Sequence, residues 1–311
     1  QATGGQYKIK VHSNASLLKM PDIKRGVQTG QAALGEILLS AYGNEDPFFQ
    51  LDGIPFVSTG YDTAKIVWDK TKPFIDARFK KQGMTVLYAV SWPGQGIYTK
   101  TPVASVADFK GLKFRAGGMS AEVFRAMGMS VVTLPGGEVV PGLQRGVIDA
   151  AEYSDPSADL ALGLPDVRKY YHMPGIHQPT GIMEFIINKK KWDELPGDLK
   201  AIVEYACMAE TLHYTLKMLD QNSKDLSTLV GPKYNVKLIE TPREILTEVL
   251  KAWDKVAEKY CKENAFFDKV YQSQKKWAER IVPYRRVGHP SYDHAADYYW
   301  GGINPYKAQK P

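Results

Sequence analysis

The chain has 311 residues, 44% of them hydrophobic and 24% charged, which is typical of a folded protein with one large or two ordinary domains. Its net charge is +6, but the basic residues lie in short, dispersed clusters without a nucleic-acid-binding signature, so we expect no nucleic-acid partner. Only two cysteines occur, which excludes a disulfide scaffold or a zinc-finger array, and no run of about 18 apolar residues predicts a membrane span.

Strands on either side of a long helix are predicted in the first part of the chain. Residues 7–13 alternate like a strand, residues 32–43 carry a second apolar run, and residues 84–92 read as a buried strand. Residues 52–83 begin with a proline-containing segment and continue as an amphipathic helix. The apolar side of this helix carries Ala64, Val67, Trp68, Phe74, Ile75 and Phe79.

Short strands and helices alternate in the middle of the chain. Residues 112–115 predict a strand that ends at Arg115, and Ser120 opens a helix that Gly128 ends. Further strands are predicted at residues 96–103, 130–135, 147–153 and 181–190. The last of these is nearly all apolar, as expected for a central or connecting strand.

The last part of the chain is mainly helical. Residues 195–229 form one long helical pattern, followed by a strand at 234–241 and helices at 241–264 and 265–281. Near a common stripe of the long helix lie Leu199, Ile202, Val203, Ala206, Leu212, Leu216 and Leu219. Residues 289–311 are polar and aromatic without a period, and we expect them to wrap a surface or stay loose.

This alternation of strands and helices predicts an α/β architecture with a largely parallel sheet. No Ser/Gly-rich linker divides the chain, which is explained if strands cross more than once between two domains. Cys207 and Cys261 both fall in helical patterns, so buried thiols are favoured over a bridge, which stays open. The start QATGGQYK looks like a chain trimmed after a targeting segment, although an arbitrary starting point looks the same.

Motifs of common catalytic chemistry are missing from the sequence. It contains no GxSxG, GxxxxGK[ST], HExxH or CxxC, and its six histidines form no close pair at a ligand-like helical spacing. Polar and aromatic residues instead gather where predicted strands begin or end: Trp92, Gln95, Arg115, Glu152, Tyr153, Asp155, His177 and Gln178. A guanidinium with two parallel N–H donors suits a carboxylate, and the oxygen-bearing side chains suit a hard metal ion.

Each of these residues also has an ordinary structural interpretation. Arg115 and Glu152 are equally typical of a buried or surface ion pair, Gln95 of a loop and Trp92 of a core. Their joint position at strand ends favours a ligand site, because ligands of open α/β sheets bind at the carboxyl ends of strands.

The order of these segments resembles the extracytoplasmic solute-binding subunits of TRAP transporters. The resemblance runs to about residue 230 and is carried mainly by residues 82–205, with the box GLKFR at residues 111–115 and the segment YYHMPGIHQPTGIMEFIINKK at residues 170–190. It implies a two-domain, periplasmic-binding-protein-like fold with crossover strands and a long hinge-spanning helix. The expected domains are residues 1–92 plus 184–230 and residues 93–183 plus 231–311.

The resemblance also implies a function and a set of site residues. Such proteins capture a small organic acid in the periplasm and deliver it to membrane permease subunits, and Arg115 matches the arginine that grips the substrate carboxylate. In the branch that binds 2-oxo and 2-hydroxy acids, a sodium or calcium ion bridges substrate and protein. Its implied ligands here are Gln95, Glu152, the backbone carbonyl of Tyr153, and Gln178.

Two departures from that branch weaken the metal assignment. The aromatic residue after the acid is usually tryptophan, whereas this chain has Tyr153, and the spacing from Arg115 to Glu152 is a residue or two short, which makes Asp155 a spare candidate. The identity of the acid stays open, because the size of the pocket depends on which side chains line the cleft, and an aromatic or branched 2-oxo acid is as compatible as lactate or pyruvate. The candidates for this lining are His12, Asn14, Phe56, Trp92, Tyr153 and Tyr170.

Two alternatives to this function stay open, and so does the oligomeric state. The same bound state could serve a signalling partner, and an enzyme could use Glu152 or His177 as an acid or base on a carboxylate substrate. The aromatic residues from Tyr292 to Trp300 could pair two subunits in a homodimer or cover their own domain.

Overall fold

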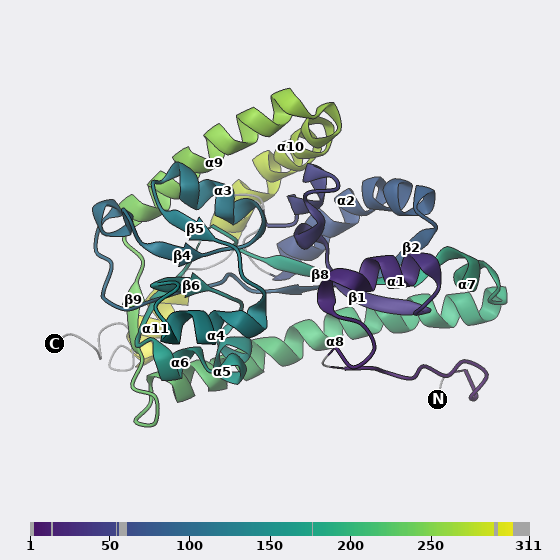
Figure 1. Ribbon diagram of the computed structural model, residues 1–311, viewed down its shortest axis with the longest axis horizontal. Helices are drawn as coiled ribbons and strands as arrows, with labels where there is room; N and C mark the ends of the chain where they lie inside the picture. The colour runs from purple at the N-terminus through teal and green to yellow at the C-terminus, as the bar shows by residue number, and fades with distance from the viewer. Residues whose placement is uncertain are drawn as a thin grey trace.

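The computed structural model describes residues 3–288, apart from 14, 54, 56–60 and 176, together with residues 292–300. The strands of this part of the chain form two sheets (Figure 1), one with the order β1-β8-β2 and the other with the order β5-β4-β6-β3-β7-β9. The first sheet consists of β1 (Leu34–Leu38), β2 (Met84–Trp92) and β8 (Gly181–Asn188). The second consists of β3 (Ile97–Thr99), β4 (Lys113–Arg115), β5 (Ser130–Val132), β6 (Ala150–Glu152), β7 (Tyr170–Met173) and β9 (Lys237–Glu240).

The three-stranded sheet is antiparallel throughout, with β8 in its centre. Ile182, Ile186 and Ile187 of β8 are buried, as the nearly unbroken apolar run of this segment predicts for a central strand. In the six-stranded sheet β4 lies parallel to both β5 and β6, while β3 lies antiparallel to β6 and β7. The first sheet is thus antiparallel and the second is mixed, so the expectation of a largely parallel sheet is wrong.

Helices cover both sheets (Figure 1). Against the three-stranded sheet pack α1 (Ile23–Thr29) and α2 (Tyr61–Lys81). Helices α9 (Arg243–Glu263) and α10 (Ala265–Gly288) share one apolar core with them, and α9 also packs on the first helix of the other half (Gly118–Ala126). Beside the six-stranded sheet lie α3 (Gly118–Ala126), α4 (Gly136–Gln144), α5 (Pro156–Leu162) and α6 (Leu164–Val167). Short elements are η1 (Met20–Asp22), η2 (Leu39–Tyr42), η3 (Pro47–Gln50), η4 (Val106–Phe109) and α7 (Lys189–Asp193), and α11 (Tyr292–Trp300) comes last.

Helix α8 (Gly197–Val230) and two crossing segments connect the two halves. The helix is 34 residues long and runs along both, contacting β2 at one end and α5 at the other (Figure 1). The segments 93–96 and 177–180 lie side by side between the sheets, since the backbone N–H of Gln95 donates to the carbonyl of Gln178 at 3.3 Å. The predicted α/β fold with crossover strands and a long helix is thus confirmed, while the expected domain boundaries stay a prediction.

Two expectations for single segments are wrong. Residues 7–13 form no strand, and Ile9 and Val11 are exposed, because these residues pair with neither sheet. The expected stripe on α8 is not one packed face: Leu199 is buried, whereas Leu212, Leu216 and Leu219 point to solvent. Residues 292–300 form a helix, and whether it wraps a surface stays a prediction.

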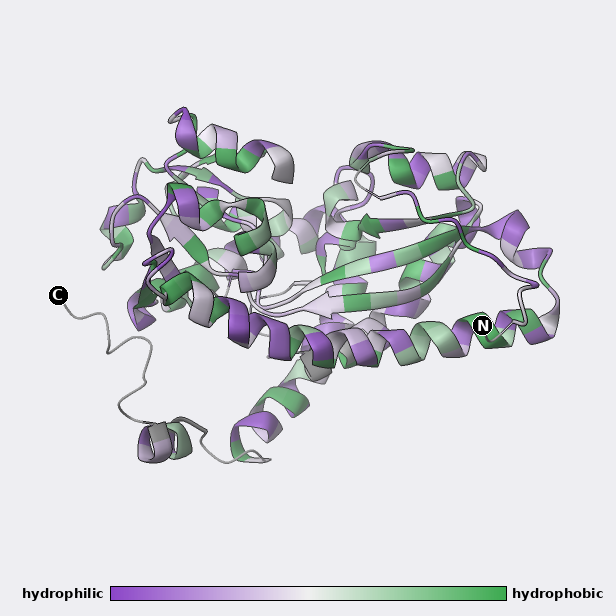
Figure 2. Cartoon of the chain, turned by 90° about the horizontal axis from the view of Figure 1, so that it is seen from below, coloured by the Kyte–Doolittle hydropathy of each residue, from purple (hydrophilic) through white to green (hydrophobic). Residues whose placement is uncertain are grey.

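Two other points concern the cysteines and the surroundings of the chain. Cys207 and Cys261 are both free thiols, so the open question of a bridge is answered for this structure. None of the helices in the described part of the chain is sufficiently long and apolar to cross a lipid bilayer. Figure 2 shows that apolar residues concentrate on the strands, while the helices carry alternating polar and apolar positions.

Candidate functional site

Strand order brings the predicted site residues to one edge of the six-stranded sheet. Because β4 and β6 are parallel, their carboxyl ends meet, and Arg115 lies in register with Ala151, one residue before Glu152. Strand β3 runs the other way, so its amino end reaches the same edge, with Ile97 opposite Glu152. Gln95 lies just before β3 and therefore joins them. Arg115, Glu152 and Gln95 thus converge although 57 residues separate the first of them from the last.

The Arg115 side chain is fixed by three hydrogen bonds. Its Nη1 donates to the carbonyl and to Oε1 of Glu152 at 2.8 and 2.9 Å, and its Nε donates to the carbonyl of Leu134 at 3.1 Å. Among the described residues Nη2 has no partner in this network. Only 13% of the side chain is exposed, so the guanidinium is held rigidly with the Nη2 amino group left to bind a ligand.

Glu152 is a buried carboxylate that forms an ion pair with Arg115. Its Oε1 also accepts a hydrogen bond from the backbone N–H of Gly117 at 3.1 Å. Burial raises the pKa of Glu152, and the charge of Arg115 and the Gly117 N–H oppose that rise. All hydrogen bonds of the carboxylate within the described residues use Oε1, which leaves Oε2 for a ligand or a cation.

Gln95 and the backbone of Tyr153 form the second group of candidate ligands. The Nε2 of Gln95 donates to the Tyr153 carbonyl at 2.9 Å, while its Oε1 is buried without a hydrogen-bond partner in the described structure. An unsatisfied buried oxygen is costly, so this atom is a strong candidate to bind something absent from the chain itself. The Tyr153 ring lies 5.9 Å from the Arg115 guanidinium and packs closely on Gly136, where a Cβ would come within 2.7 Å of it.

The crossing segments carry Gln178 and Trp92. The side chain of Gln178 lies against Gly53, where a Cβ would come within 2.9 Å of its Cγ. The Trp92 ring fills the space beside Gly181, and its Nε1 is buried without a partner among the described residues. Both side chains therefore lie at the junction of the two sheets.

Asp155 caps one helix and binds another. Its Oδ1 caps α5 through the N–H of Ala158 at 2.9 Å, and its Oδ2 accepts from Asn222 of α8 at 3.2 Å. Both oxygens are thus in use, so nothing in its contacts supports the spare role expected for it. A neighbouring aspartate, Asp159, fixes the backbone after Tyr153 by accepting from Ser154 at 3.0 Å, and burial raises its pKa well above the usual value.

His177 is buried beside Phe124, with ring centroids 5.0 Å apart. Burial lowers its pKa to about 3, so the imidazole is neutral at physiological pH and makes a poor acid. Tyr170 is half-buried on β7, and His12 is exposed in the N-terminal segment. Asn14 and Phe56 lie outside the described residues.

Sequence reasoning missed the backbone groups of the site. Neither the N–H of Gly117 nor the carbonyl of Leu134 carries a chemical signature in the sequence, although Gly117 belongs to the segment GLKFRAGG. It also missed a buried acidic pair beside the crossing segments. There a carboxylate oxygen of Asp52 accepts a hydrogen bond from the N–H of Ile182 at 3.3 Å, and burial raises the pKa of Asp52 to about 7. Burial, together with the charge of Asp52, also raises the pKa of Glu184 well above its usual value.

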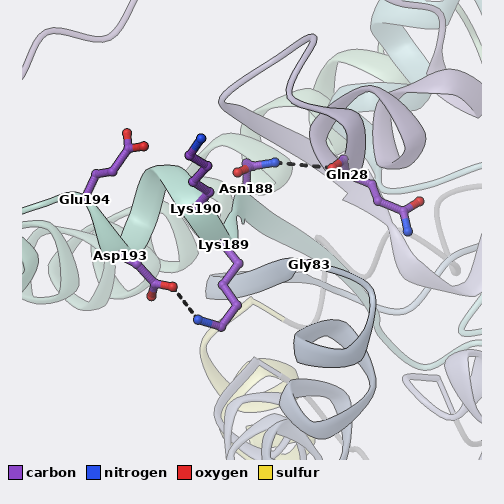
Figure 3. Close-up of a pocket in the computed structure, with 7 residues that line it drawn as sticks. All are labelled: Gln28, Gly83, Asn188, Lys189, Lys190, Asp193 and Glu194. Carbon is purple, nitrogen blue, oxygen red and sulfur yellow. Dashed lines mark hydrogen bonds and ion pairs between the residues drawn. The ribbon is translucent and has the colours of Figure 1, made fainter.

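A large cavity lies away from the predicted site residues and is open to solvent. It measures about 630 Å³ and is lined by Gln28, Gly83, Asn188, Lys189, Lys190, Asp193 and Glu194 (Figure 3). Lys189 pairs with Asp193, and Asn188 donates to the carbonyl of Gln28 at 3.3 Å, so these groups satisfy one another. Its charges cancel locally, and none of the predicted ligand residues reaches it.

The donors near Arg115 fit a hard cation better than a transition metal. In the described part of the chain no three His, Cys, Asp or Glu side chains cluster around a common point. The available groups are instead oxygens: the orphaned Oε1 of Gln95, the carbonyl of Tyr153 and the free Oε2 of Glu152. Amide, carbonyl and carboxylate oxygens are the ligands that calcium prefers.

Comparison with known proteins decides the family. The family model of the bacterial extracellular solute-binding proteins, family 7, matches residues 1–264. The chain belongs to this family. Its members are binding receptors rather than enzymes, which excludes the catalytic alternative for Glu152 and His177.

Individual relatives of this family 7 protein agree with the fold. It is 33% identical over 205 residues to a monocarboxylate 2-oxoacid-binding periplasmic protein of Nostoc sp., covering 65% of this chain and 55% of the relative. It is 32% identical to DctP7 of Bordetella pertussis, an extracytoplasmic solute receptor binding pyroglutamic acid, with a TM-score of 0.80 over 88% of this chain and 90% of that one. A TRAP solute-binding protein from Bordetella bronchiseptica, a dimer with calcium and picolinate in one site, is 23% identical with a TM-score of 0.86 over 99% of this chain and 90% of that one.

Proposed function

We propose that the chain is the periplasmic solute-binding subunit of a TRAP transporter and that it delivers a small monocarboxylate to a membrane permease. The observation that carries the proposal is Arg115, a nearly buried guanidinium whose Nη2 amino group has no hydrogen-bond partner among the described residues, at the edge where β3, β4 and β6 meet. A carboxylate is the ligand that this group recognises best. The Nostoc and Bordetella relatives, which bind organic acids, support this ligand class.

The charge balance of the site favours a cation together with the acid. Arg115 and Glu152 already neutralise each other through a 2.9 Å ion pair. A bound monocarboxylate therefore adds one unpaired negative charge to a buried site, which costs several kcal/mol unless something compensates it. A sodium or calcium ion held by Gln95, the Tyr153 carbonyl and Glu152 supplies that compensation, and Gln178 could join them if its amide turned from Gly53. The ion would supply positive charge next to the substrate and would bind the substrate's oxygens.

A 2-oxo or 2-hydroxy acid suits this arrangement. Its carboxylate and the neighbouring oxygen can bind a hard cation together, while the other carboxylate oxygen accepts from Arg115. The Tyr153 ring beside the guanidinium provides an apolar wall, which agrees with an aromatic or branched acid as well as with a small one. The calcium and picolinate of the Bordetella bronchiseptica protein are a chelating acid and cation of this type.

Glu152 supports a second candidate ligand. Its free Oε2 can accept a hydrogen bond from a ligand N–H, as a lactam acid such as pyroglutamate would offer. In that mode the ligand donates to the carboxylate and no cation is required. The two modes differ in their dependence on metal, and that difference can be measured.

Calorimetry on ligand-free protein tests the proposal. The protein is unfolded, dialysed and refolded to remove bound acids, then titrated with pyruvate, 4-methyl-2-oxopentanoate, lactate and pyroglutamate, each with and without chelator. We expect one 2-oxo or 2-hydroxy acid to bind at one site per chain, with affinity lost in chelator and restored by calcium or sodium. If the affinity for pyroglutamate is the same with and without chelator, the lactam mode is supported instead.

The control is the same titration with the matching amine or alcohol, which lacks the carboxylate. Binding of these compounds as tightly as of the acids would contradict the role of Arg115. Failure of all the acids, in protein shown to be folded by its circular dichroism, would refute the proposed ligand class.

A further inference from the structure

Helix α8 presents an unusual face to solvent. Five large apolar side chains on its outer side are exposed: Tyr205 by 71%, Met208 by 63%, Leu212 by 63%, Leu216 by 60% and Leu219 by 59%. The helix lies along the outer edge of the molecule, so this side is turned away from both sheets (Figure 1). We call these five residues the α8 stripe.

The stripe is continuous along the helix. Its members are separated by three or four residues, which places them on one side over about 21 Å at 1.5 Å per residue. Ala201 and Ser223, three turns on either side of Leu212, continue it with small uncharged side chains. A solvent-facing helix surface normally carries charged residues, so a stripe of this length indicates a surface that is covered by a partner.

The spacing of the stripe is symmetric about Leu212. Tyr205 lies seven residues before it and Leu219 seven after, while Met208 lies four before and Leu216 four after. When two copies of this helix pack antiparallel about a two-fold axis at Leu212, Tyr205 therefore meets the partner's Leu219 and Met208 meets the partner's Leu216. Self-complementarity of this kind is the requirement for an isologous dimer.

Charge and area agree with a second copy as the occupant. Asp198 and Lys224 lie on the same side of α8, near opposite ends of the stripe, so the antiparallel arrangement brings the aspartate of one copy beside the lysine of the other. The five exposed side chains, at about 200 Å² each when fully exposed, present on the order of 600 Å². With the flanking small residues this approaches the roughly 800 Å² per partner of a stable interface.

We propose that two copies of this chain dimerise through the α8 stripe, with antiparallel helices that cross at Leu212. The interface lies on the outer side of the helix, away from Arg115 and Glu152. Ligand binding is therefore independent of this contact in the first instance, and the two can be tested separately.

Sedimentation equilibrium of the full chain provides the first test. We expect the wild-type chain to dimerise and Leu212→Asp to raise the dimer dissociation constant by roughly a hundredfold, because two carboxylates would face each other in an apolar contact. Val147→Asp places the same charge on an exposed apolar residue outside the stripe and should leave the dimer intact. A wild-type chain that stays monomeric at every concentration, or a Leu212→Asp dimer as tight as wild type, would overturn the proposal.

The register is tested by exchanging charges. Met208→Lys and Leu216→Glu should each weaken the dimer, and the double variant should restore it, because each lysine then meets the partner's glutamate. Disulfide trapping gives an independent readout: Leu212→Cys, in a chain with Cys207 and Cys261 replaced by serine, should oxidise to a covalent dimer, whereas Lys217→Cys on another side of α8 should not. Equal trapping at both positions, or no rescue by the double variant, would refute this register.

Discussion

Replacement of Arg115 by alanine should affect stability and ligand affinity by separable amounts. The change removes three hydrogen bonds, of 2.8, 2.9 and 3.1 Å, and leaves the Glu152 carboxylate buried without its counter-charge. Breaking a buried ion pair from one side costs about 3–5 kcal/mol of unfolding free energy. Loss of a charge-assisted hydrogen bond to the ligand carboxylate costs about 1.5–3 kcal/mol, which is roughly a 10- to 150-fold weaker affinity.

A double-mutant cycle separates the two effects. In Arg115→Ala/Glu152→Gln no buried charge is stranded, so urea denaturation should show that much of the lost unfolding free energy returns. The affinity measured by calorimetry should not return, because the guanidinium that binds the ligand is still missing. The single variant Glu152→Gln keeps Arg115 and shows how much affinity depends on the carboxylate itself.

Arg168 offers a matched control. Its guanidinium also donates to backbone carbonyls, those of Asp149 at 2.8 Å and Leu143 at 3.1 Å, but it lies outside the candidate site. Arg168→Ala should therefore lower the unfolding free energy with an unchanged dissociation constant. A folded Arg115→Ala protein that binds its acid as tightly as wild type, or a double variant as unstable as the single one, would refute this reasoning.

Three further variants or measurements probe the rest of the structure. Burial raises the pKa of Asp52 from 3.8 to about 7, so the folded state binds this proton more tightly and the unfolding free energy should fall as pH rises from about 4 to about 7. Asp52→Asn should flatten that pH dependence by an amount on the order of 2–4 kcal/mol in urea denaturation, and an unchanged slope would contradict the shift. Gly181→Ala places a Cβ within 1.9 Å of the Trp92 ring and should lower the unfolding free energy by about 1–3 kcal/mol. Gly137→Ala, where the new Cβ would have no atom within 4 Å, should not destabilise the protein. Equal unfolding midpoints of the two variants would contradict this packing. An NMR titration should find the His177 imidazole neutral down to about pH 4, since burial lowers its pKa to about 3, and protonation near pH 6 would show that the ring is exposed.

The positions of the site residues follow from local signals in the sequence. The alternation in LKFR and VIDAAEY predicts strands, and glycine and proline mark their ends, so Arg115 and Glu152 had to lie at carboxyl ends of strands. That these strands are neighbours and parallel is a property of the whole sheet, which the sequence does not carry locally. The ion pair between the two residues depends on the register Arg115 to Ala151, and only the structure shows it. From the sequence, a ligand-binding role and an ion-pairing role of Arg115 were alternatives. In the structure Arg115 pairs with Glu152 through Nη1, and its free Nη2 leaves room for a ligand as well.

The failures of sequence reasoning have a common physical cause. Residues 7–13 alternate like a strand, but alternation alone does not provide a partner strand, and the segment stays outside both sheets. The apolar residues of α8 follow a helical period on more than one side, and periodicity does not tell which side meets the core. In both cases tertiary contacts decide what local pattern leaves open.

The proposed site connects ligand binding to the geometry of the two halves. Gln95 and Gln178 lie on the two segments that join the sheets, and a backbone hydrogen bond of 3.3 Å links them. The Gly118 end of α3, next to Glu152 through Gly117, faces Ser40 and Gln50 of the other half. In the proposed binding mode, an acid at Arg115 and a cation at Gln95 would therefore contact residues near both sheets. We infer that such a ligand and cation would bind most tightly when the halves are close, because that position excludes water from the buried charges, and capture would follow from this preference.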